Sequence, residues 1–383
     1  MQRRSFLTAA ACAALSPVLP VQVLAAAPAM RTRWTIRECE GLDAISFLGP
    51  LTGKPFYTRF YQAELATFRP RLPVAALDAL ARLDAASTAT GALLWPGLAV
   101  IVSGGPTGTL DQVIASVRAA ETVLRPPLKG SEHWSDESWR LFVAGREDLL
   151  TVLEALRDAR FPAFRTEVAA PRAGRLDQLR TLFSGLDVIA EQERLLGRTL
   201  RPDIEIDLLW FCVPHGARVQ GQRFLAHHRY PDMAMIKVAA HEIFHPPIPL
   251  NGPTAMASIS ALRADPLFGR ILAEKDRATG YNTLEGILNE DLCQALDQIV
   301  QERLGHVEMP AGERWSQSDQ GMHVLAAGLY GYLKGDGYDR TGGNIERWLS
   351  RGVVVGRLSP ASLHPMAATV LGRRPDQLWV KPV

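Results

Sequence analysis

Cysteine and net charge are both scarce in this sequence of 383 residues. There are 4 cysteines, and the formal net charge at pH 7 is only +2. Cys12 belongs to the N-terminal apolar segment, so Cys39, Cys212 and Cys293 allow at most one disulfide, which excludes a disulfide-stabilised scaffold. Cys212 or Cys293 could act as a soft metal ligand, although a buried free thiol is the commoner role. The near balance of charge gives no reason to expect a nucleic-acid partner.

Internal repeats, low-complexity segments and motifs for nucleotides or calcium are also missing. Residues 103–108 are rich in glycine, but they lack the lysine of a P-loop and the G-x-G-x-x-G pattern, so they predict a plain turn. Residues 334–343 contain Asp-Gly-Tyr-Asp, which resembles part of a calcium loop. Their spacing does not fit an EF-hand and the final Glu is missing, so we expect a flexible turn there as well.

The first 29 residues carry the features of an export signal. Residues 3–7 read Arg-Arg-Ser-Phe-Leu, and an alanine-rich, weakly apolar run follows to about residue 24. Small residues at 25–29 suit cleavage, and the order of the first residues favours the twin-arginine route over an ordinary Sec signal. The run is too short and too rich in small residues for a stable membrane anchor. We therefore expect a mature chain without an anchor, in the periplasm or secreted.

The rest of the chain has the composition of an ordinary globular protein, with 47% hydrophobic and 21% charged residues. This length is sufficient for one large domain or two smaller ones. Apolar residues recur at helical spacing at 135–160 and 176–196, and a capping box at 109–112 opens a further helix to about residue 124. We therefore expect a mainly helical N-terminal region at 30–200.

A change in character follows residue 200. Residues 204–213 begin with alternating apolar and acidic side chains, and residues 218–230 are predicted to return as the second strand of a hairpin. An earlier short strand is predicted at 31–40. Helices are predicted at 254–264, 266–276, 283–304, 320–333, 344–351 and 360–371. The fold class is therefore α+β, mainly helical, with the sheet contributing to a second region at 201–383.

The most informative stretch is residues 238–245, which read Val-Ala-Ala-His-Glu-Ile-Phe-His. His241 and His245 are four residues apart, so they lie on one face of a helix and can both reach one Zn²⁺. Glu242 then lies beside the open coordination position, where it can take a proton from a metal-bound water. The flanking residues are apolar, which predicts burial, and a buried Glu without a partner is costly. The alternative is a pair of core histidines with a Glu satisfied by its neighbours.

Two prolines follow the motif directly, at positions 246 and 247. A residue before proline is disfavoured in the α region, so His245 is expected to act from the last turn of its helix. At these residues the chain resembles the zincin metallopeptidases, although the usual zincin helix continues past the second His. The resemblance implies a zincin-like lobe at 201–383, in which the His-Glu-x-x-His helix lies next to a small sheet. It also implies that extended substrate adds to the sheet edge, near His227 and His228, which are otherwise expected to be exposed strand residues.

A catalytic zinc site needs a third protein ligand, with water in the fourth position. A third His six residues after His245, as in metzincins, is excluded because residue 251 is Asn. Glu285 and Glu290, on the helix predicted at 283–304, are the candidates. Glu285 has a competing role in a capping box with Asn282. Glu290 follows an Asn, and Asn-Glu resembles the third-ligand motif of the gluzincins.

Helical phase also bears on the choice between these two glutamates. Leucines 284, 288 and 292 define one apolar face, with Glu285 at its edge. Glu290 lies roughly opposite, on a face with small residues that would let the motif helix approach closely. We therefore favour Glu290 over Glu285. Gln294, one turn later, occupies the position where a thermolysin-like helix has an Asp that orients a ligand His.

A hydrolase also needs a donor for the developing oxyanion. Tyr281, just before the Glu290 helix, is our candidate, and His323, Tyr330 and Tyr332 are others. A packed aromatic is the simpler role for each of them. Spacing alone does not decide among the four.

The resemblance leads us to expect an exported zinc metallopeptidase that acts on a peptide or protein substrate. His241, His245 and Glu290 would hold Zn²⁺, and Glu242 would be the general base. Two alternatives stay open, a non-catalytic, peptidase-like binding protein and a metal-free helical periplasmic protein. The oligomeric state and the cleavage specificity are not indicated by the sequence.

Overall fold

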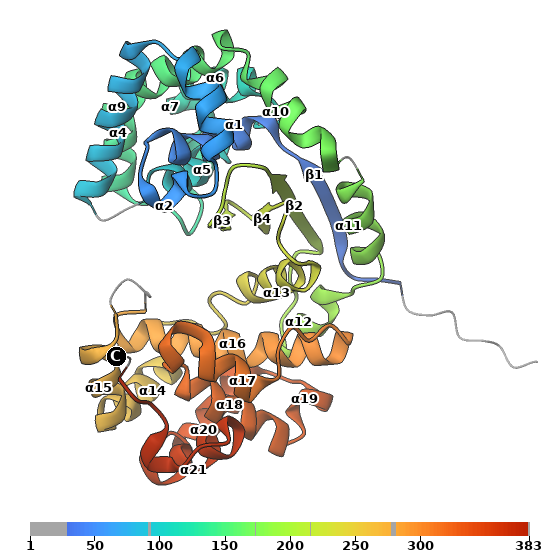
Figure 1. The fold of residues 1–383 in the computed structure, drawn as a ribbon. Coiled ribbons are helices and arrows are strands. Elements are labelled where there is room, and N and C mark those ends of the chain that lie inside the picture. The colour runs from blue at the N-terminus through green and yellow to red at the C-terminus, as the bar shows by residue number, and fades with distance from the viewer. Residues whose placement is uncertain (1–28, 91–92, 173, 215, 277–280, 382–383) are drawn as a thin grey trace, which may run out of the picture. The chain divides into compact units, whose positions relative to one another are not determined.

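Helices predominate in the computed structural model, and the strands among its described residues form a four-stranded sheet (Figure 1). The structure describes residues 29–90, 93–172, 174–214, 216–276 and 281–381. The expected signal segment at 1–29 lies outside the described residues except for its last position. Residues Arg31–Val383 form one compact unit. The fold class is therefore α+β and mainly helical.

The sheet has the strand order β1-β2-β4-β3. Its strands are β1 (Arg33–Glu38), β2 (Asp203–Leu209), β3 (Ala217–Val219) and β4 (Arg223–His227). β1 and β4 both run parallel to β2, and only β3 and β4 are antiparallel. The predicted hairpin between 204–213 and 218–230 is therefore wrong. A tight turn around Gly221, whose φ is +79°, joins β3 to β4 instead, so β4 returns in the same direction as β2.

The alternation in β2 has the predicted consequence for burial. Ile204, Ile206 and Leu208 are buried in a core that also contains α12, α13 and α16. The acidic residues between them face arginines of the neighbouring strands. Asp203 accepts hydrogen bonds from Arg33 of β1, and the fully buried Asp207 accepts from Arg37 and Arg223. Opposite charges on adjacent strands thus stabilise the parallel pairing.

Twelve described helices precede β2. They are α1 (Glu40–Leu51), α2 (Pro55–Thr58), α3 (Gln62–Phe68), α4 (Val74–Ala89), α5 (Leu94–Val102), α6 (Leu110–Arg118), α7 (Ala120–Val123), α8 (Arg125–Lys129), α9 (Asp136–Asp158), α10 (Phe161–Ala169), α11 (Arg175–Phe183) and α12 (Val188–Leu196), with 3-10 turns η1 (Arg69–Arg71) and η2 (Ala170–Arg172). The helix predicted from the capping box begins as expected, with Thr109 capping α6, but it ends at Arg118. Most of these helices, from α1 to α10, bury their apolar faces in a second core, to which Leu209, Val219 and Leu225 of the sheet segments also belong.

The apolar stripe at 176–196 forms two helices rather than one. α11 ends at Phe183, and α12 begins after Asp187, whose carboxylate caps it by accepting from the backbone of Ala190. The same carboxylate accepts from the backbone of Arg31 and Thr32, just before β1. A residue that prefers the N-cap therefore breaks the stripe and ties α12 to the segment before β1.

The C-terminal helices surround one long, buried helix. They are α13 (Asp232–Glu242), α14 (Pro253–Arg263), α15 (Pro266–Glu274), α16 (Leu284–Leu304), α17 (Ala311–Gln317), α18 (Val324–Gly335), α19 (Tyr338–Thr341), α20 (Ile345–Val354) and α21 (Pro360–Leu371), with 3-10 turns η4 (Ser318–Gly321) and η5 (Pro375–Gln377). α16 is buried along most of its length and contacts α12, α13, α14 and α18. α13 lies between the sheet and α16 (Figure 1). The flexible turn predicted at 334–343 contains the short helix α19.

Membrane-spanning segments were sought only in the described part of the chain. No single helix there has the length and hydropathy needed to cross a membrane. Only α4 and α5 together, bent by 96° at their junction, meet that test.

Candidate metal centre

The motif helix α13 ends earlier than the sequence predicts. Its last helical residue is Glu242, and His245 lies in the turn that follows. The backbone forms tighter turns there. The N–H of Phe244 donates to the carbonyl of His241, and the N–H of His245 donates to the carbonyl of Glu242. His245 therefore does not act from the last helical turn. The reason is the restriction that Pro246 places on the residue before it.

Two arginines hold this turn, residues 242–246, which we call the ligand turn. Arg218 of β3 donates to the carbonyl oxygens of Glu242 at 3.1 Å and His245 at 3.3 Å. The other end of its guanidinium pairs with Glu132, 2.6 Å away. Arg198 donates to the carbonyl of Pro246 at 2.9 Å. The carbonyls left free at the end of α13 thus receive charged donors, which fix the backbone at the motif.

The helix α16 begins one residue later than the capping-box prediction requires. Thr283 is its N-cap, and its hydroxyl accepts from the backbone of Gly286. Asn282 instead accepts a hydrogen bond from Lys275. Glu285 is exposed, so the predicted capping box of Asn282 and Glu285 is wrong. The hydroxyl of Thr283 accepts from the backbone amide at N3, so capping of the first turn does not require Glu285.

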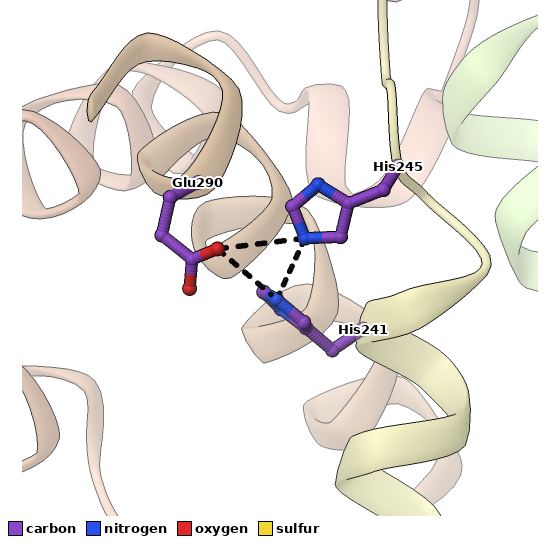
Figure 2. Close-up of side chains that lie close together, drawn as sticks. All are labelled: His241, His245 and Glu290. Carbon is purple, nitrogen blue, oxygen red and sulfur yellow. Dashed lines mark hydrogen bonds and ion pairs between the residues drawn. The ribbon is translucent and has the colours of Figure 1, made fainter. Parts of the chain in front are cut away.

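Three predicted ligands converge between α13 and α16, as Figure 2 shows. The Nε2 atoms of His241 and His245 are 2.9 Å apart. Oε2 of Glu290 is 3.4 Å from each of them. The structure therefore brings Glu290, and not Glu285, to the two imidazoles. All three side chains are buried or half-buried.

The far side of each imidazole has its own partner. Nδ1 of His241 lies 2.6 Å from Oδ2 of Asp297, a fully buried carboxylate that also accepts from Arg314. Nδ1 of His245 lies 3.4 Å from the sulfur of Cys293. The contact with Asp297 favours a proton on Nδ1 of His241, and the Nε2 atoms of both imidazoles face Glu290. Sequence reasoning missed Asp297 in this role, although its position seven residues after Glu290 places both on one helix face.

The position of Gln294 suggested that it orients a ligand histidine. It lies near the site, but it contacts Glu290 instead. Its amide nitrogen donates to Oε1 of Glu290 at 2.8 Å. Its amide oxygen accepts from the indole of Trp315, also at 2.8 Å. Behind it lies His323, which is fully buried and held by Asp291 and Asp319 at 2.7 Å and 2.8 Å.

The donor set fits a zinc ion. Zn–N and Zn–O bonds of about 2.0–2.1 Å in a tetrahedron place neighbouring donors about 3.3 Å apart, close to the separations found here. The two carboxylates that face His241 favour a positive charge on its imidazole. Burial opposes this charge, but the carboxylates of Glu290 and Asp297 raise the pKa of His241 to about 10. Burial also acts to raise the pKa of Glu290, and the facing imidazoles instead bring it well below its usual range.

Glu242 and Tyr281 are the predicted catalytic residues. In the described part of the chain, no side-chain hydrogen bond or ion pair engages the Glu242 carboxylate, which is half-buried and close enough to Tyr281 to affect its ionisation. Tyr281 has a φ of +50° and its phenol lies beside Glu290. Burial, and then the charge of Glu290, raises the pKa of Tyr281. The phenol therefore keeps its proton at neutral pH.

The other candidate donors have partners elsewhere. The hydroxyl of Tyr330 donates to Glu302, and that of Tyr332 to the carbonyl of Ser362. His227 and His228, expected to be exposed, are both buried, because their rings pack against each other and His228 stacks on Trp210.

The chain was compared with protein families, with curated proteins and with solved structures. None of them matches it. A functional argument for this protein therefore depends on the geometry and chemistry of its own residues.

Proposed function

We propose that the protein is a zinc-dependent metallopeptidase, exported from the cytoplasm, that acts on a peptide or protein substrate. The observation that carries the proposal is the convergence of His241, His245 and Glu290, with Glu242 next to the first ligand in the chain. Nδ1 of each imidazole already has a partner, so the two Nε2 atoms and Oε2 of Glu290 are directed towards one point. Two imidazoles and one carboxylate form a ligand set typical of hydrolytic zinc sites.

The residues around the ligands have the chemistry that amide hydrolysis requires. A zinc ion supplies a Lewis acid, which lowers the pKa of water and polarises a carbonyl. Glu242 accepts the proton of the attacking water and delivers it to the leaving amine. Tyr281, protonated because of its raised pKa, donates a hydrogen bond to the developing oxyanion. The ligand turn holds Glu242 through its backbone carbonyl, and no side-chain partner among the described residues competes for its carboxylate.

Zinc analysis and a cleavage assay on three variants test this proposal. Glu242→Gln should keep about one zinc per chain and lose hydrolysis, because it removes the base without touching a ligand. Glu290→Gln should lose zinc as well as activity. Glu285→Gln, which changes an exposed glutamate on the same helix, is the matched control and should behave as the wild type.

The outcomes separate the proposal from its two alternatives. A wild type that takes up zinc and cleaves no member of a peptide library is a binding protein. A wild type that folds stably and takes up no zinc is a metal-free helical protein. An active Glu242→Gln variant would exclude the catalytic role given to this residue.

A further inference from the structure

The two carboxylate oxygens of Glu290 have different surroundings. Oε2 faces both imidazoles, and Figure 2 shows the other oxygen turned away from them. That second oxygen, Oε1, accepts the 2.8 Å hydrogen bond from Gln294. Only one oxygen is therefore free to bind a metal, whereas a carboxylate without such a partner can offer both.

The direction of the Gln294 amide is determined by its two partners. The indole N–H of Trp315 can only donate, and the carboxylate of Glu290 can only accept. Only one amide orientation satisfies both, with the oxygen towards Trp315 and the nitrogen towards Glu290. The amide nitrogen is also 3.2 Å from Nε2 of His323, but both ring nitrogens of His323 already face carboxylates. This neighbour therefore offers the amide no acceptor and does not reverse the assignment.

The whole chain of contacts is shielded from water. Trp315 is 0% exposed, Gln294 6% and Glu290 4%. Hydrogen bonds in such surroundings are strong, and leaving one group unsatisfied is costly. Trp315 comes from α17, the next helix along the chain, so the orientation of Glu290 on α16 depends on packing against a second helix.

We propose that Trp315 and Gln294 are positioning residues that hold Glu290 as a one-oxygen ligand. The indole fixes the amide, the amide occupies Oε1, and Oε2 is left to complete the site with His241 and His245. This inference rests on the proposed metal site, but it does not depend on the substrate or on catalysis.

The test measures zinc affinity by competition with a chelator, in four variants. Gln294→Met keeps the side-chain length and removes both hydrogen bonds. Trp315→Phe keeps an aromatic ring and removes the indole donor. Trp379→Phe is the matched control, because Trp379 is equally buried in the same core and its indole N–H has no partner in the described structure. The fourth variant combines Gln294→Met with Trp315→Phe.

Gln294→Met should weaken zinc binding by about 10- to 100-fold, the range typical of outer partners of metal ligands. Trp315→Phe should weaken it by about tenfold, at the lower end of that range. Because both act through one path, the double variant should match Gln294→Met alone rather than multiply the two effects. Trp379→Phe should bind zinc as the wild type does. The cobalt-substituted Gln294→Met protein should also absorb more weakly in the visible range, since a carboxylate binding through both oxygens raises the coordination number.

Each alternative result has a definite meaning. Equal losses in Trp315→Phe and Trp379→Phe would reduce the role of Trp315 to packing and overturn the proposal. Multiplying effects in the double variant would also overturn it. If the wild type binds zinc and Gln294→Met is unchanged, the positioning role fails while the metal site stands. If the wild type binds no zinc, both fail, and if it binds zinc without cleaving peptides, only the proposed function fails.

Discussion

Replacement of Asp297 by Asn should lower both the stability of this protein and its affinity for the proposed zinc ion. Asp297 is 0% exposed and accepts from His241 at 2.6 Å, from Gln301 at 3.0 Å and from both terminal nitrogens of Arg314. Asn keeps the shape but removes the charge. Arg314, which is 4% exposed, then has no carboxylate partner among the residues that the structure describes. Removing one member of a buried ion pair costs about 3–5 kcal/mol of unfolding free energy.

The effect on zinc has a different origin and a smaller size. Asp297 fixes the ring of His241 through Nδ1, and losing such a partner weakens metal binding by about 10- to 100-fold. This corresponds to about 1.4–2.8 kcal/mol. Urea unfolding in the presence of a chelator measures the first effect on the metal-free protein, and chelator competition measures the second.

A second substitution shows which contact of Asp297 controls the zinc affinity. Asp297→Asn combined with Arg314→Met removes the stranded charge, so much of the lost stability should return while zinc affinity stays low. The reasoning would be refuted if the double variant regained wild-type zinc affinity, because Arg314 and not the bond to His241 would then control the site. It would also be refuted if Asp297→Asn unfolded at the wild-type urea concentration.

Three further predictions concern protons and the ligand turn. Because the pKa of His241 is raised to about 10, zinc must displace a proton, so zinc affinity should rise about tenfold per pH unit between pH 6 and 9. Calorimetry in two buffers measures the released proton, and a zinc affinity that does not change with pH would contradict this prediction. Arg218→Met, which frees the carbonyls of the ligand turn, should weaken zinc binding by about tenfold, whereas the exposed Arg229→Met should not. Burial opposes the charge on His323, but Asp291 and Asp319 raise its pKa to about 9. Its stabilisation is therefore complete below about pH 6.5 and lost by about pH 9, so the urea midpoint of Asp319→Asn should lie below that of the wild type at pH 6 and approach it at pH 10.

The parts of the site that sequence could predict depend on local periodicity. The four-residue spacing predicted that His241 and His245 come together, and their Nε2 atoms do meet although α13 ends at Glu242 and His245 lies in the turn that follows. The phase of the later helix likewise separated Glu290 from Glu285, since the two lie on different faces. Several helix bounds followed in the same way, and α21 begins and ends where predicted.

The parts that could not be predicted depend on contacts between distant segments. The parallel pairing of β2 with β4 is decided by β3, a strand of three residues with little pattern of its own. The role of Asp297 could not be predicted, because its partners His241 and Arg314 come from two other elements. The role of Arg218 could not be predicted, because a single arginine in a short strand does not indicate which backbone carbonyls it will contact.

The contacts of α16 also define a sequence motif. Glu290, Cys293, Gln294 and Asp297 follow one another at helical intervals of three, one and three residues, and each is a proposed metal ligand or touches one. Written as sequence, this is E-x-x-C-Q-x-x-D, to be found downstream of H-E-x-x-H-P-P. A chain that contains both halves should be a relative of this protein even where the rest has diverged beyond detection. The segment between the halves carries α14 and α15 and then Tyr281, the proposed oxyanion donor. Differences in length should therefore fall among α14 and α15 and not beside Tyr281.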